Sequence, residues 1–264
     1  MTEPNAETTR RAIVEHTRRL AESAAAAGPD AAVPTAPEWT VTDLVTHLGQ
    51  TQHWVAEIIE RRITDPTRLP TEMAVSPADP GDWLAWLTES AQRVADACAD
   101  DALDAPVFNA AGDERSGGRF WMVSMLNEAV VHGFDAAIAA NRPVDVDAGI
   151  AAALIGNHLR MLTSPTWEMQ RPESAHALRG TGQTLQWQAT DTADAWLIER
   201  RPDGATWQPG TGQADVTLTG PAGSLFLTLI RRLPLTDHAT AAISIDGDSD
   251  LARHWLDHTA HAAG

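Results

Sequence analysis

The chain has 264 residues, a formal net charge of −17, 43% hydrophobic residues and one cysteine. This length suits one large or two ordinary domains, and the hydrophobic fraction is that of a globular protein. The acidic balance argues against nucleic acids and anionic membranes as partners, because both need a positive surface patch. The single Cys98 excludes an intramolecular disulfide and favours a reducing cytoplasm.

The first residues are polar and acidic, without the apolar core of a signal peptide, and no apolar run approaches the length of a membrane span. We therefore predict a cytoplasmic location. Lysine and tyrosine, whose codons are AT-rich, are absent from the sequence. This codon argument predicts a high-GC bacterial genome such as an actinobacterial one, and it does not bear on function.

The first two-thirds of the chain predicts a helical bundle. Proline-rich residues 29–39 and glycine-rich residues 109–118 are predicted loops, and Thr40 with Asp43 is predicted to cap a helix. Amphipathic or apolar helical patterns cover residues 6–27, 40–63, 80–100, 119–141 and 147–162. Helices of this length joined by loops favour a four- or five-helix bundle.

The pattern changes after residue 163. Residues 164–174 are rich in proline and polar side chains and are predicted to form a linker. Strands are predicted at residues 184–189, 195–200, 205–208, 214–218 and 241–246, and helices at residues 221–232 and 248–261. The sequence thus predicts a two-domain α+β protein, with a bundle over residues 1–165 and a small α+β domain over residues 174–264.

Glu128 and His132 are the most informative pair in the sequence. They are four residues apart in a predicted helix, so both side chains can reach one point. A carboxylate and an imidazole supply two of the three protein ligands of a typical catalytic zinc site. Asp135 falls on the same side of the helix. His47 is the best candidate for the third ligand, with His53 and His158 as rivals.

A solvated Glu–His pair is the alternative interpretation of this spacing. The neighbours close to the same face are apolar and place the pair inward: Met122, Met125, Leu126, Ala129, Ala136 and Ala137. Buried acidic residues are rare without a partner or a metal. The residues alone therefore leave a metal site and a buried polar pair as open alternatives.

Other candidate groups have simpler explanations. Cys98 occupies an apolar helical position close to Asp96, Asp100 and Asp101, which would raise the pKa of its thiol, so we predict a core residue and no nucleophile. His254 and His258 are also four residues apart, and we predict a solvated face there. The sequence has no P-loop, dinucleotide fingerprint or Gly-x-Ser-x-Gly elbow.

Residues 39–49 (WTVTDLVTHLG) and residues 127–135 (NEAVVHGFD) together resemble the mycothiol-dependent maleylpyruvate isomerase family. The resemblance implies a DinB-like bundle, mycothiol as the thiol, and zinc held by His47, Glu128 and His132. Residues 218–234 and 245–248 resemble the C-terminal domain of the family, which is similar to sterol-carrier folds and contributes an arginine. Arg232 best matches that arginine, with Arg231 second, although the aromatic-Gly-Arg triplet of the family is Ile230-Arg231-Arg232 here.

The predicted function is a zinc-dependent, mycothiol-using isomerase. The thiolate would add to a cis-enedioate, the new single bond would rotate, and elimination would give the trans isomer. Arg232 or Arg231 would hold a substrate carboxylate, and Asp135 would orient His132. The alternatives are a mycothiol S-transferase that acts on another electrophile, and a non-catalytic ligand-binding module. The expected partners are an electrophilic or acidic small molecule and a low-molecular-weight thiol, bound by a monomer or a homodimer.

Overall fold

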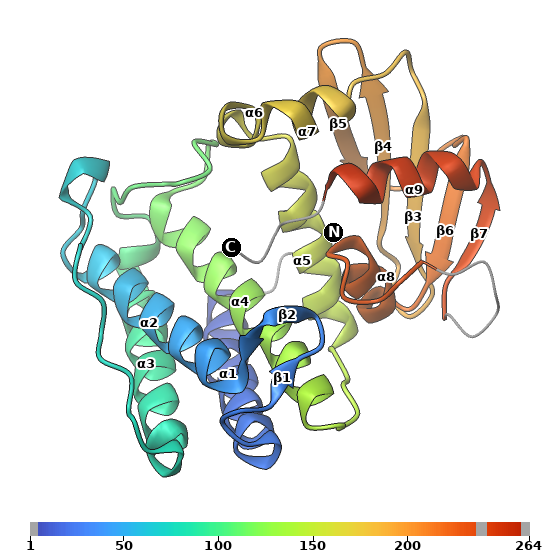
Figure 1. The fold of residues 1–264 in the computed structure, drawn as a ribbon. Coiled ribbons are helices and arrows are strands. Elements are labelled where there is room, and N and C mark those ends of the chain that lie inside the picture. The colour runs from blue at the N-terminus through green and yellow to red at the C-terminus, as the bar shows by residue number, and fades with distance from the viewer. Residues whose placement is uncertain (1–4, 236–241, 260–264) are drawn as a thin grey trace. The chain divides into compact units, whose positions relative to one another are not determined.

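The computed structural model describes residues 5–235 and 242–259 (Figure 1). The fold is α+β, as predicted, and it divides into two compact units, one of residues 5–144 and one that begins at Asp145. The domain limits predicted from the sequence, 1–165 and 174–264, stay a prediction. Within the described ranges, no helix combines the length and the apolar character that crossing a membrane requires.

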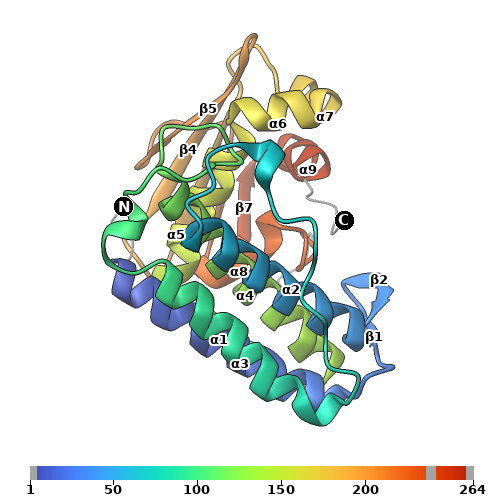
Figure 2. The ribbon, with the colours of Figure 1, turned by 90° about the vertical axis from the view of Figure 1, so that its left-hand side faces the viewer.

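The N-terminal unit is built on four long helices (Figure 2): α1 (Ala6–Ala27), α2 (Val41–Glu60), α3 (Trp83–Ala97) and α4 (Gly117–Ala139). Both α1 and α2 pack against α3 and α4. Leu44 and Leu48 from α2 and Leu87 from α3 are fully buried. Helix α4 is buried on most of its circumference, so polar side chains on it must find partners inside the unit.

Side-chain caps explain where α1 and α2 begin. The Asn5 side chain accepts a hydrogen bond from the Thr8 backbone at the start of α1, and Gly28 ends that helix with a positive φ of 90°. Thr40 and Asp43 form the predicted capping box at the start of α2. The helix predicted from residue 80 begins with the 3-10 turn η2 (Pro80–Asp82) before α3; η1 (Pro66–Arg68) and η3 (Asp100–Leu103) are two further such turns.

The loop predicted for residues 29–39 is wrong. This segment contains an antiparallel hairpin of β1 (Ala32–Val33) and β2 (Ala36–Thr40). Val33 is fully buried and Ala36 is 3% exposed, and both pack into the core formed by α1, α2, α3 and α4. The prolines around them conceal the strands in the sequence, because proline disfavours the interior of a sheet and is tolerated in a two-stranded edge ribbon.

The C-terminal unit contains a five-stranded sheet in the order β5-β4-β3-β6-β7 (Figure 1). The strands are β3 (Thr184–Ala189), β4 (Ala195–Arg201), β5 (Gly204–Pro209), β6 (Val216–Gly220) and β7 (Ser244–Gly247). β3 and β6 are parallel, and the other neighbours are antiparallel. Trp187 of β3 pairs with Trp196 of β4, and both side chains are fully buried.

The described residues of this unit also form the helices α5 (Ala148–Leu162), α6 (Pro165–Gln170), α7 (Pro172–Ala177), α8 (Ala222–Leu229) and α9 (Ser249–His258). Helices α8 and α9 contact the sheet, and α5, predicted as the last bundle helix, packs against α8. Phe226 and Trp255, from α8 and α9, are fully buried. Residue 241 of the predicted strand 241–246 and residues 260 and 261 of the predicted helix 248–261 lie outside the described residues.

The linker predicted for residues 164–174 is also wrong, because this segment forms α6 and the first half of α7. Each of these short helices begins with a proline, Pro165 or Pro172. Proline suits the first helical position, since its missing N–H would have no intrahelical partner there. The Ser164 hydroxyl caps α6 by accepting a hydrogen bond from the Trp167 backbone. Two short helices that begin with proline therefore have the same composition as a linker.

The start of α4 gives a test of how tightly this helix is fixed. A Cβ atom at Gly117 would collide with the backbone carbonyl of Val107, which cannot move as a side chain can. We expect Gly117→Ala to lower the free energy of unfolding by about 1–3 kcal/mol through overpacking. Urea unfolding followed by circular dichroism measures this change.

Gly133→Ala in the same helix is the matched control. A Cβ there would meet only the His16 carbonyl, at 3.7 Å, which is an ordinary contact. Alanine should therefore stabilise the protein by about 0.5–1 kcal/mol through reduced backbone entropy. Equal effects at both positions would show that the start of α4 is less tightly packed than the structure indicates.

Candidate metal centre

His47, Glu128 and His132 come together on facing helices of the N-terminal unit. His47 lies in the second turn of α2, and Glu128 and His132 lie one turn apart on α4. The His47 Nε2 atom is 3.2 Å, and the His132 Nε2 atom 3.1 Å, from the same Glu128 Oε2 atom. The three candidate ligand atoms lie within 4.8 Å of one another, and this is the one such group in the described part of the chain.

The charges of this group are strongly coupled. Burial opposes ionisation of Glu128, but hydrogen bonds from His132 and His47 outweigh it and lower the pKa of the carboxyl. Burial also disfavours the charged form of His132, yet hydrogen bonds and the negative charges of Asp135 and Glu128 raise the pKa of the imidazole to about 9. Without a metal, a proton on His132 therefore supplies the positive charge between two carboxylates.

Asp135 lies behind His132, away from the other two ligand candidates. Its Oδ2 atom is 3.0 Å from His132 Nδ1, and its Oδ1 atom accepts a hydrogen bond of 2.6 Å from the Thr35 hydroxyl. The Asp135 side chain is 1% exposed. If His132 Nε2 faces a metal, Nδ1 carries the proton and donates it to Asp135. This contact between Asp135 and His132 is the one that the predicted role of Asp135, orienting the His132 ring, requires. The role itself stays a prediction.

Trp39, at the end of the hairpin, packs against both imidazoles. Its ring centroid is 5.0 Å from that of His47 and 5.8 Å from that of His132, and with His132 the rings are stacked. No individual role was predicted from the sequence for Trp39 or for Thr35. The local sequence draws attention to Trp39, because this residue directly precedes Thr40, the N-cap of α2. No local pattern identifies Thr35, since its hydrogen-bond partner Asp135 is 100 residues away in the sequence.

The centre has a buried side and an accessible side. The His132 side chain is 7% exposed, whereas those of His47 and Glu128 are 32% and 29% exposed within the described chain. Two imidazole nitrogens and one carboxylate oxygen form a donor set that zinc takes in catalytic sites, with a further position open. A metal ion bound by these three side chains would thus keep one side open to a small ligand.

The rival histidines lie elsewhere. His53, also on α2, contacts Arg93 and the Trp86 ring, and burial lowers its pKa. His158 is buried in α5, outside the group of candidate ligands. The predicted solvated face at His254 and His258 is wrong: both rings are half-buried, and each has a ring nitrogen 2.8 Å from a backbone carbonyl oxygen.

Cys98 is fully buried, and burial raises the pKa of its thiol to about 12. A thiol with this pKa stays protonated near neutral pH and is a poor nucleophile or metal ligand. Its buried position agrees with the core residue predicted from the sequence.

The two candidate arginines follow α8 in the C-terminal unit. Arg231 is exposed and adopts a positive φ of 65°; its guanidinium contacts the Asp257 carboxylate at 2.9 Å and donates to the Leu256 carbonyl. Arg232 is half-buried, and its backbone N–H donates to the Leu227 carbonyl. Their predicted role toward a substrate carboxylate stays a prediction.

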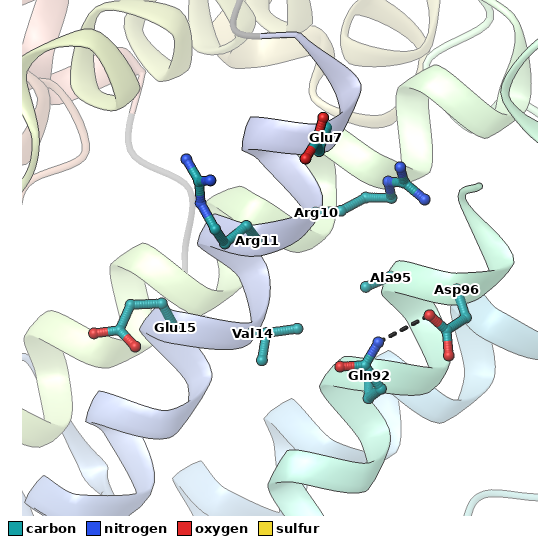
Figure 3. Close-up of a pocket in the computed structure, with 8 residues that line it drawn as sticks. All are labelled: Glu7, Arg10, Arg11, Val14, Glu15, Gln92, Ala95 and Asp96. Carbon is teal, nitrogen blue, oxygen red and sulfur yellow. Dashed lines mark hydrogen bonds between the residues drawn. The ribbon is translucent and has the colours of Figure 1, made fainter. Parts of the chain in front are cut away.

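A separate surface cleft of about 370 Å³ lies between α1 and α3 (Figure 3). Its described lining combines both charge signs and contains none of the candidate metal ligands: Glu7, Arg10, Arg11, Val14, Glu15, Gln92, Ala95 and Asp96. The Gln92 amide donates a hydrogen bond to Asp96 across one edge. The metal centre and this cleft are therefore distinct features of the N-terminal unit.

Residues 10–137 match the model of a protein family described as the mycothiol maleylpyruvate isomerase N-terminal domain. The match confirms, for this segment, the resemblance predicted from the sequence. It contains every residue placed at the metal centre above. No curated protein sequence matches the chain.

Two solved structures share the fold over nearly the whole chain. The mycothiol-dependent maleylpyruvate isomerase is 14% identical with a TM-score of 0.56, and the match covers 93% of this chain and 96% of that chain. A mutant of a protein with the same name is 13% identical with a TM-score of 0.59 and the same coverage. At these identities the likeness shows a common fold.

The raised pKa of His132 predicts how pH affects the chelator-treated protein. A protonated imidazole that is favoured by folding contributes stability below its ordinary pKa of 6.5, and this contribution is lost as the pH rises through about 9. The free energy of unfolding should therefore fall between pH 6.5 and pH 9 more steeply in the unmodified protein than in His132→Gln. Urea titrations at several pH values measure this difference, and parallel profiles would contradict it.

Proposed function

We propose that the chain binds one divalent metal, zinc by preference, through His47, Glu128 and His132, and uses it with mycothiol to isomerise a small electrophilic acid. The observation that carries the proposal is the convergence of two imidazole nitrogens, one from α4 and one from the facing helix α2, on one carboxylate oxygen of Glu128, at 3.1 and 3.2 Å. The family match over residues 10–137 supports the choice of thiol and reaction.

The donor set favours zinc over the other common divalent cations. Calcium and magnesium prefer shells of oxygen atoms, whereas two of the three donors here are imidazole nitrogens. Two histidines and one glutamate are a known ligand set of catalytic zinc, which keeps a fourth position for water or substrate. The carboxylate also offsets part of the charge of a divalent cation that lies partly out of water.

Each residue of the centre has a definite task in this proposal. His47 and Glu128, which are partly exposed, would hold the ion together with the buried His132. His132 must give up the proton at Nε2 and keep the one at Nδ1, which Asp135 accepts. A metal in this site supplies Lewis acidity, which lowers the pKa of a thiol that takes the open position.

The reaction needs a nucleophile that the protein itself does not provide, because the pKa of Cys98 is about 12. An exogenous thiol can add to the double bond of a cis-enedioate, allow rotation about the new single bond, and leave again to give the trans isomer. The sulfur–carbon bond forms and breaks once, so the thiol is regenerated and no redox partner is needed. A thiol of this kind also suits the cytoplasmic location predicted from the sequence.

The proposal assigns Arg232, with Arg231 second, to a carboxylate of the substrate. The planar guanidinium fork matches a carboxylate with two parallel hydrogen bonds, which a lysine ammonium cannot reproduce. The assignment rests on the resemblance of residues 218–234 to the C-terminal domain of the family. The role of these arginines must therefore be tested with variants of the full-length protein.

The metal ligands can be tested by removing them one at a time. We expect His47→Ala, Glu128→Ala and His132→Ala each to lose most of the one equivalent of zinc that the unmodified protein binds, because two remaining donors hold zinc weakly. Elemental analysis of the purified proteins after dialysis measures the stoichiometry. His53→Ala is the matched control, since His53 is on the same helix and contacts Arg93 instead.

A full equivalent of zinc in His47→Ala would remove His47 from the site and make His53 and His158 the next candidates. An unmodified protein that binds no divalent metal would contradict the proposed function.

The arginines can be tested by activity once a substrate is found. We expect Arg232→Ala to lower kcat/KM by roughly 10- to 100-fold, the value of one charge-assisted contact, without release of zinc. Arg232→Lys should recover part of the rate. Assays of the product separate an isomer from a thiol adduct, and so separate an isomerase from an S-transferase.

Arg231→Ala is the comparison variant for this series. Full activity in Arg232→Ala with a loss in Arg231→Ala would transfer the role to Arg231. Full activity in both variants would show that neither arginine acts on the substrate.

A further inference from the structure

The β1–β2 hairpin is fixed against α4 beside the metal centre. Val33 and Ala36, on either side of its turn, are buried in the same core cluster as Ala136 of α4. Ala136 directly follows Asp135 in the sequence. Thr35 lies in the turn between the strands, so the buried neighbours on both sides fix its position next to the Asp135 carboxylate.

A continuous chain of hydrogen bonds runs from this turn into the centre. The Thr35 hydroxyl donates to Asp135 Oδ1 at 2.6 Å, and Asp135 Oδ2 is 3.0 Å from His132 Nδ1. On the other side of the ring, His132 Nε2 is 3.1 Å from Glu128 Oε2. The two oxygens of Asp135 therefore contact two different elements, the hairpin and α4.

We propose that Thr35 is a positioning residue of the metal centre, acting through Asp135 on the imidazole of His132. This inference rests on the metal site of the proposed function and extends it to a residue on a separate element. Held at both oxygens, the carboxylate has a fixed plane, and the His132 ring is fixed with it. Nε2 then stays directed at the other two ligands before any ion binds.

Loss of the Thr35 hydroxyl would act in two ways. Asp135 is fully buried, so the loss of a hydrogen-bond donor leaves one of its oxygens less well compensated. The carboxylate could then rotate about its side-chain bonds and release the His132 ring from a single orientation. Outer partners of metal ligands typically account for a 10- to 100-fold change in metal affinity, which sets the scale of the expected effect.

The decisive comparison is Thr35→Ser against Thr35→Ala. Both variants lack the threonine methyl group, and they differ only in the hydroxyl. We expect Thr35→Ala to weaken zinc binding by roughly 10- to 100-fold, with Asp135→Asn weakened at least as much, and Thr35→Ser to bind nearly as tightly as the unmodified protein. Competition with a chromophoric zinc chelator measures the dissociation constants in the full-length protein.

Thr42→Val is the matched control. The Thr42 hydroxyl lies close to the hairpin in the sequence but donates to the Pro29 carbonyl, away from the centre. It should leave zinc affinity unchanged. Cobalt(II) in place of zinc adds a spectroscopic readout: its visible absorption should change in Thr35→Ala and stay unchanged in Thr35→Ser and Thr42→Val, because the bands report the geometry of the ligands.

Circular dichroism and urea unfolding check that each variant is folded. If Thr35→Ala is unfolded, Thr35→Val replaces it, since valine fills the same space without a donor. Equal zinc affinity in the hydroxyl-free variant and the unmodified protein would overturn the inference and leave the proposed function intact. A serine variant as weak as the alanine variant would also overturn it. An unmodified protein without zinc affinity would overturn both together.

Discussion

One carboxylate oxygen of Glu128 lies between two imidazole nitrogens, and this contact constrains the N-terminal unit. It requires α2 and α4 to face each other at a fixed position along both axes. The capping box of Thr40 and Asp43 fixes where α2 begins, and the packed glycines at residues 117 and 118 fix where α4 begins. The apolar surface of α4 then buries the contact from one side. Hydrophobic packing supplies the stability, and the helix ends supply the alignment of the polar group.

The polar groups of the centre are costly to bury, and this cost explains how they are arranged. Asp135 is fully buried and Glu128 is partly buried, and each contacts His132. Without a metal, a proton on this ring balances the two carboxylates, which is why its pKa is raised to about 9. A divalent cation can take over that role with better geometry, since it accepts lone pairs from all three ligands. In the proposed function, a proton and a metal would therefore compete for the Nε2 atom of His132.

The sequence predicts the parts of this site that depend on local periodicity. Glu128 and His132 are one helical turn apart, and the apolar neighbours such as Met125 and Ala129 correctly place His132 inward, whereas Glu128 is only partly buried. His47 required the family resemblance as well, because three histidines at helical positions were open alternatives. The hairpin was missed because prolines concealed its strands, and residues 164–174 resemble a linker in composition although they form short helices. Thr35 lies 100 residues from Asp135, so no local pattern connects them.

The division of the chain affects how its chemistry can vary. Thr35, Trp39 and the three candidate ligands all belong to residues 5–144, and the family model matches residues 10–137. The candidate arginines belong to the unit that begins at Asp145. In the proposed function, metal binding and activation of a thiol would thus depend on residues of the first unit, and recognition of a substrate carboxylate on residues of the second. The match to the domain family covers only the first of these two units, so it bears on the candidate metal centre and not on the candidate arginines.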